Sequence, residues 1–72
     1  MNNQTASTAA ILTIGQYAAR KNARLVGATS AQGETILVII NEFDHAFAAA
    51  SSKISVADAY EKLAERIKAK GN

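Results

Sequence analysis

Apolar residues are most concentrated in residues 34–41, which read Glu-Thr-Ile-Leu-Val-Ile-Ile-Asn. An unbroken run of large aliphatic side chains, most of them β-branched, occupies the middle of this stretch: Ile36, Leu37, Val38, Ile39 and Ile40. A short β-branched run bounded by polar residues is typical of a buried strand. The pattern therefore predicts that the core forms around residues 34–41.

A second β-prone run precedes this stretch and is joined to it by a short connection. Residues 24–30 and 34–40 are separated only by Ala31-Gln32-Gly33. Three linking residues that end in glycine are typical of a β-hairpin with a bulge-type turn, in which the glycine takes the left-handed conformation. We therefore predict a hairpin with Gly33 at the left-handed position.

The second strand of this hairpin would be apolar on both of its faces. Leu37 and Ile39 would point to one side of the sheet. The other side would carry Ile36, Val38 and Ile40. Both sides then need cover, and we expect helices on one side and a second copy of the chain on the other.

Helical spacing appears at both ends of the chain. Ser7 or Thr8 can cap a first helix that runs to about Asn22. Its apolar face would hold Ala10, Ile11, Ile14, Tyr17 and Ala18. Ser55 can cap a long last helix, with Asp58 in its first turn and Gly71 as its C-cap. The buried side of that helix would be Val56, Ala59, Tyr60, Leu63 and Ile67.

The segment after the hairpin carries the signals of a short helix. Asn41 can cap it, and acidic residues follow in the first turn. Phe43, Phe47 and Ala50 would line one side of this helix, which would end near Ser51-Ser52. The predicted fold is therefore α+β, in the order helix, β-hairpin, short helix and long C-terminal helix.

An all-α alternative follows from the same central residues. Between residues 34 and 51 a set of apolar positions also falls on one helical face: Ile36, Ile39, Ile40, Phe43, Ala46, Phe47 and Ala50. A single long helix there would give a three-helix bundle, which the richness in alanine favours. The β-branched run, the turn glycine and the Asn41 start signal favour the hairpin.

The 72 residues predict one small domain, 1–72, in which residues 1–6 are loosely held. A chain of this length buries only about 60% of its unfolded surface. Without cysteine it has no disulfide to add stability, so we expect a homodimer. The N-terminus has no basic signal region, and no run approaches the roughly 18 apolar residues of a membrane span. We therefore expect a cytoplasmic protein with no membrane contact.

Catalytic and metal-binding patterns are missing from the sequence. His45 is the sole histidine of the sequence, and it stands beside Asp44 on a polar stretch. It has no nucleophile at a motif spacing and no second metal ligand nearby, and the sequence has no glycine-rich phosphate loop. We therefore assign no catalytic, cofactor-binding or metal site, and no enzymatic activity.

Residues 49–55, followed by a helix, resemble the turn region of the helix-turn-helix family. The family binds DNA through the helix after the turn. This chain departs from the pattern, because Lys53 stands where glycine is frequent. Its would-be recognition helix also exposes Asp58, Glu61 and Glu65, which phosphate would repel.

Two functional hypotheses remain. The first is a regulatory or interaction protein that binds a protein partner as a homodimer, with the interface at Tyr17, Ile36, Leu37, Val38, Ile39 and Ile40. The second is a small nucleic-acid-binding regulator, although a net charge of +2 is weakly basic. Its contacts would come from the basic residues near the two helix ends: Arg20, Lys21, Arg24, Lys62, Arg66 and Lys68.

Overall fold

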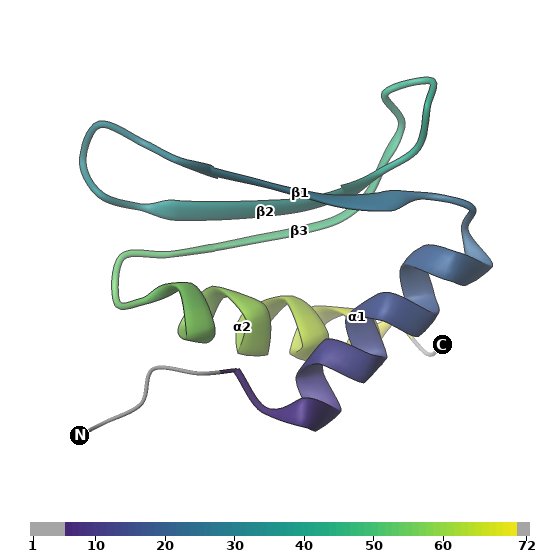
Figure 1. Ribbon diagram of the computed structural model, residues 1–72, viewed down its shortest axis with the longest axis horizontal. Coiled ribbons are helices and arrows are strands. Elements are labelled where there is room, and N and C mark those ends of the chain that lie inside the picture. The colour runs from purple at the N-terminus through teal and green to yellow at the C-terminus, as the bar shows by residue number, and fades with distance from the viewer. Residues whose placement is uncertain (1–5, 71–72) are drawn as a thin grey trace.

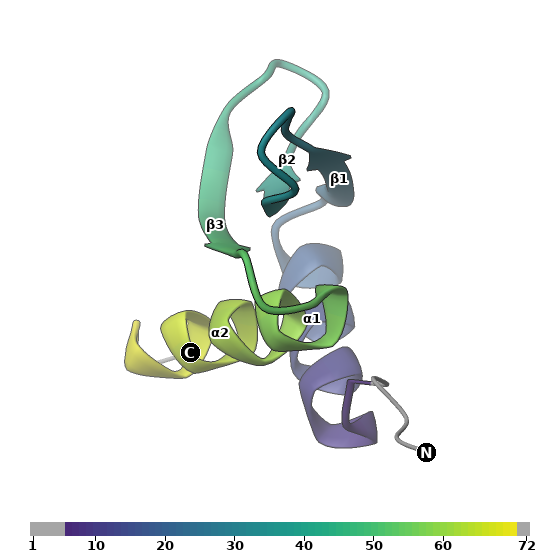
Figure 2. The ribbon, with the colours of Figure 1, turned by 90° about the vertical axis from the view of Figure 1, so that its left-hand side faces the viewer.

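The computed structural model describes residues 6–70 as two helices and a three-stranded antiparallel sheet. The elements, in chain order, are α1 (Thr8–Arg20), β1 (Arg24–Thr29), β2 (Thr35–Ile40), β3 (Ala46–Ser52) and α2 (Val56–Ala69). Both helices lie on the same side of the sheet and cross each other obliquely (Figures 1 and 2). The predicted α+β class is confirmed, and the fold has two layers, one of strands and one of helices.

The two helices begin where the capping residues predict. The Ser7 side chain accepts a hydrogen bond from the backbone N–H of Ala10, and the Ser55 side chain accepts one from Asp58 at 2.9 Å. These bonds satisfy backbone donors that the first turn of a helix leaves free. Residues 1–5 and Gly71 lie outside the described residues. The loosely held N-terminus and the Gly71 C-cap therefore stay predictions.

The hairpin is confirmed. β1 pairs with β2, and β2 with β3, in the spatial order β1-β2-β3. At the turn, Ser30 N–H donates to the Glu34 carbonyl at 2.8 Å and Gly33 N–H donates to the Ser30 carbonyl at 3.0 Å. Gly33 has φ +82°, the left-handed conformation that glycine adopts without steric cost. This pairing rules out the long central helix, and with it the three-helix bundle.

The short helix predicted after Asn41 is wrong, because that segment forms a loop followed by β3. The Asn41 side-chain oxygen accepts the backbone N–H groups of Phe43 at 2.9 Å and His45 at 3.0 Å, so it closes a turn. Asp44 takes a positive φ of 62°, which a helix excludes. Pairing with β2 outweighs the helical preference of the alanines in β3, since propensity is weaker than tertiary context. A strand at Ala46–Ser52 also removes the first helix of a helix-turn-helix.

The core lies between β2, β3 and the two helices. Leu37 and Ile39 of β2 meet Leu63 and Ile67 of α2 there, together with residues of α1. The predicted buried side of α2 is largely confirmed, although Tyr60 is half-buried and Val56 is 55% exposed. Phe43, predicted to line one side of a short helix, is 80% exposed in the β2–β3 loop. Within residues 6–70, neither helix has the length and apolar character required to cross a membrane.

Candidate interaction surface

The face of the sheet that points away from the helices is apolar at its centre. Residues directly opposite each other in antiparallel strands point to the same side. Val38 lies between Val26 and Ala49, and Ile36 lies between Ala28 and Ser51. We call the apolar centre of this side the open face, and define it by these residues: Val26, Ala28, Ile36, Val38, Ile40 and Ala49.

No described element covers the open face. Both helices lie on the opposite side of the sheet (Figures 1 and 2). Val26 is 40% exposed, and the three large side chains of β2 on this side are half-buried. The alternate residues of the same strand, Leu37 and Ile39, are buried beneath the sheet. Burial therefore follows the two-residue period of β2, and the large apolar side chains of one side remain in contact with water.

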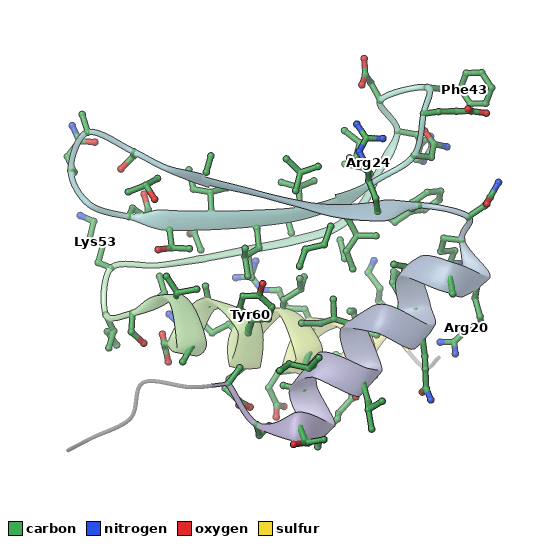
Figure 3. All side chains as sticks on the ribbon, in the orientation of Figure 1. Arg20, Arg24, Phe43, Lys53 and Tyr60 are labelled. Atoms are coloured by element: carbon green, nitrogen blue, oxygen red, sulfur yellow. The ribbon has the colours of Figure 1, made fainter. Side chains whose placement is uncertain are left out.

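Charged residues stand at the two ends of the open face. Arg24 lies opposite Ile40 at one end, where it is exposed. Glu34 lies opposite Ser30 at the hairpin end, where it is half-buried. Figure 3 shows Lys53 at the hairpin end as well, in the connection between β3 and α2. Each end of the face therefore carries charge beside an apolar centre.

The β2–β3 loop rises on the open side of the sheet at the Arg24 end. It spans residues 41–45, and Figures 1 and 2 show it directed away from the helices. Phe43 stands at its tip (Figure 3), 80% exposed, and its neighbours in the sequence, Glu42 and Asp44, are exposed acids. This loop extends the apolar surface beyond the strands and adds negative charge to that end.

The free edge of β3 is protected by α2. Arg66 donates from Nη1 to the carbonyl oxygen of Ala49 at 2.7 Å. That carbonyl points away from β2, so the guanidinium satisfies one of the acceptors that an edge strand leaves unpaired. A hollow of about 220 Å³ lies beside this contact and is lined by Glu34, Ile36, Ala49, Ala50, Ser51 and Arg66.

The structure does not gather the six predicted nucleic-acid contacts into one patch. Lys21 lies over the rings of Tyr17 and Phe47, with Nζ 5.5 and 5.8 Å from their centroids. Arg20 also lies near the Tyr17 ring, at 5.9 Å. Lys62 forms an ion pair with Asp58 at 3.5 Å.

The other basic residues are distributed over the molecule. Arg24 belongs to the open side of the sheet and Arg66 to the β3 edge. Lys68 lies near Glu61 of the same helix. Of the six predicted contacts, Arg20 and Lys21 are thus the two that lie over the same ring, that of Tyr17.

The predicted partner interface divides between two environments. Ile36, Val38 and Ile40 belong to the open face. Leu37, Ile39 and Tyr17 are buried in the core of the chain. The alternation of side chains along a strand already separated the buried Leu37 and Ile39 from the other three β2 residues in the sequence.

Sequence reasoning missed three residues of the open face. Val26 and Ala28 follow directly from the hairpin register, so the signal for them was present. Ala49 was hidden, because its segment was expected to be helical. It lies beside Val38 once β3 pairs with β2.

His45 has the exposed position that the sequence suggested. Its ring lies against that of Phe47, with the centroids 4.8 Å apart. Among the described residues, no three His, Cys, Asp or Glu side chains come together in a way that would hold a metal ion. A second hollow of about 230 Å³, near the Arg24 end, is lined by Asn22, Ala23, Arg24, Ile40, Asn41 and Glu42. The Asn41 side-chain oxygen already accepts hydrogen bonds from two backbone N–H groups of the β2–β3 loop, so it stabilises that loop.

Glu61 ties the start of α1 to α2. Its Oε2 accepts the backbone N–H of Ser7 at 2.7 Å. That hydrogen bond, more than the nearby Lys68, holds the pKa of the Glu61 carboxyl below its ordinary value of 4.5. The contact fixes the helix layer and lies on the side of the molecule away from the open face.

No protein-family model, curated protein or solved structure matches the chain.

Proposed function

We propose that the protein is a small, non-enzymatic interaction protein that works as a homodimer, with the open faces of two copies packed against each other. The observation that supports this is the side of β2 carrying Ile36, Val38 and Ile40, which no other part of residues 6–70 covers. Antiparallel sheets that expose one side to water ordinarily carry polar residues there. An apolar centre with charged ends is instead typical of an association surface.

The size of the open face sets the expected strength of association. Three strands of six or seven residues, about 4.8 Å apart, give a footprint of roughly 14 by 20 Å. Stable interfaces bury about 800 Å² on each partner, so the strands alone supply a small interface. The loop at residues 41–45, with Phe43 at its tip, enlarges the contact. We expect a dissociation constant of about 1–100 µM.

Sedimentation equilibrium from about 1 to 500 µM tests this proposal. The mass should rise from 7.6 kDa toward twice that value as concentration increases. Val38→Lys should abolish the rise, because it places a charge at the centre of the open face. Leu12→Lys is the matched control, since Leu12 is an exposed aliphatic residue on α1, away from the sheet.

Two outcomes contradict the proposal. One is a mass of 7.6 kDa throughout the concentration range. The other is a dimer that Val38→Lys and Leu12→Lys weaken equally. Circular dichroism verifies that each variant is folded, and Val26→Lys, on the exposed edge strand β1, replaces Val38→Lys if the latter is unfolded.

The alternative function is a nucleic-acid-binding regulator, and the observation in its favour is the cationic end of α1 at Arg20 and Lys21. Phosphate contacts would make such binding strongly salt-dependent. Fluorescence anisotropy with duplex DNA and duplex RNA, at low and at physiological salt, separates the two functions. Under our proposal neither duplex binds at physiological salt, and replacing Arg20, Lys21 and Arg24 by Gln has no effect on duplex binding at low salt.

The dimer and its interface contain no feature that requires an oxidising environment. A chain without cysteine suits a reducing compartment, and we place the protein in the cytoplasm on this ground.

A further inference from the structure

Two copies can stack their open faces about a two-fold axis in two ways. The axis lies in the plane between the sheets and runs either along the strands or across them. In both cases the strands of the two sheets remain within about 30° of alignment, with the sheets about 10 Å apart. The two arrangements differ in which ends of the faces meet, so the charges at those ends can distinguish them.

An axis along the strands places each end over itself. β2 is the central strand, so Glu34 at its hairpin end would lie over Glu34 of the second copy. This axis also exchanges β1 and β3, so the loop acids Glu42 and Asp44, between β2 and β3, would lie over the β1 side of the other copy. The two Glu34 carboxylates, which face each other across a sheet-to-sheet distance of about 10 Å, disfavour this arrangement.

An axis across the strands exchanges the ends. The Arg24 end of one copy then lies over the Glu34 end of the other, and the symmetry makes this contact twice. Lys53, at the hairpin end, comes over the end that holds Glu42 and Asp44 (Figure 3). The apolar centre is retained, because the axis crosses β2 near Leu37 and places Ile36 over Val38 of the second copy.

The charges needed for these contacts are available. Lys62–Asp58 is the ion pair found among residues 6–70, and Arg24, Glu34 and Lys53 take no part in it. The acids of the loop, Glu42 and Asp44, are exposed. Each end of the open face therefore presents charge that the opposite end complements.

We infer that the homodimer stacks its open faces with the two-fold axis across the strands, so that Arg24 of each copy lies beside Glu34 of the other. This inference rests on the proposed dimer and specifies its geometry. Opposite charges at the swapped ends fix the orientation of the two copies, while the aliphatic centre supplies most of the attraction. The β1–β2 hairpins then point to opposite ends of the dimer.

A distance measurement tests the orientation directly. The chain has no cysteine, so Gln32→Cys at the exposed hairpin tip gives a single site for a spin label. An axis across the strands places the two labels about 30 Å apart, whereas an axis along the strands places them about 10–15 Å apart. Pulsed electron resonance at a concentration that favours the dimer measures this separation. The longer distance supports the inference and the shorter one overturns it.

Charge variants provide an independent test in which the two orientations predict opposite signs. Glu34→Gln removes an attraction if the axis lies across the strands, and it removes a repulsion if the axis lies along them. We expect it to raise the dissociation constant about three- to tenfold, and Glu34→Arg to raise it further. Combining Glu34→Arg with Arg24→Glu should restore affinity to within about threefold of the original chain.

The outcomes separate this inference from the proposed function. If the unaltered chain shows no dimer, both are overturned. If a dimer forms and is sensitive to Val38→Lys, but Glu34→Gln strengthens it or leaves it unchanged, the orientation alone is overturned. Leu12→Lys again serves as the control for a charge change outside the interface.

Discussion

Neighbouring isoleucines on β2 give a test of the layer structure, because they point to opposite sides of the sheet. Ile39 is 0% exposed and packs between the sheet and the helices, whereas Ile40 is half-buried on the open face. Ile→Ala removes three carbon atoms at either position. At Ile39 this loses about 2.4 kcal/mol of transfer free energy, at about 0.8 kcal/mol for each buried carbon group. The cavity left behind adds about 1–2 kcal/mol, so we expect a loss of about 3–4 kcal/mol.

A loss of that size is large for this chain. Domains have free energies of unfolding of roughly 0.05–0.15 kcal/mol per residue, which gives about 4–11 kcal/mol here. Ile40→Ala makes the same chemical change at a half-buried site, so we expect about 1 kcal/mol for the monomer.

Urea unfolding followed by circular dichroism measures both variants. At low micromolar concentration the two losses should differ by about 2–3 kcal/mol. At higher concentration the loss at Ile40 should grow as the dimer forms, while the loss at Ile39 should stay constant. Equal losses at both positions in the dilute sample would refute the assignment of one buried and one open face.

Three further outcomes test local features of the fold. Gly33→Ala should lower the free energy of unfolding by about 1 kcal/mol or more in urea titrations, because φ is +82°, while Gly33→Asn should lower it by less. Ser55→Ala should lower it by about 1 kcal/mol through loss of the α2 N-cap, and an equal effect of Ser55→Asp would contradict that role. The lowered pKa of Glu61 contributes stability that is fully present above its ordinary value of 4.5 and is lost as pH falls through the lowered pKa. Glu61→Gln should therefore weaken the dependence of unfolding on acid pH, and an NMR titration that gives Glu61 an ordinary pKa would contradict the Ser7 contact.

Local signals in the sequence account for the parts of the fold that were predicted. Ser7 and Ser55 cap helices, and Gly33 closes a hairpin, because each acts on backbone groups within a few residues. The strand at Ala46–Ser52 was missed because its cause is distant in sequence. β3 forms because it pairs with the edge of β2 that β1 leaves open. Asn41 suits the start of a helix, but here its side chain closes a turn. The same error concealed Ala49 from the predicted interface.

The alanines of β3 have opposite consequences on the two sides of the sheet. On the inner side, Ala48 and Ala50 are buried against the helix layer. Their small side chains pack in the core beside Ala59, Leu63 and Ile67 of α2. On the outer side, Ala49 lies opposite Val38, and its methyl group covers little of the valine side chain.

A larger residue at Ala49 would cover one side of Val38 and make the outer surface of the sheet less flat. Alanine instead keeps the aliphatic side chains of β2 accessible while the interior stays packed. The alanines that favoured a helix in the sequence therefore give β3 a different use on each side of the sheet. It admits α2 on one side, and on the other it leaves a flat apolar surface that a second copy can cover.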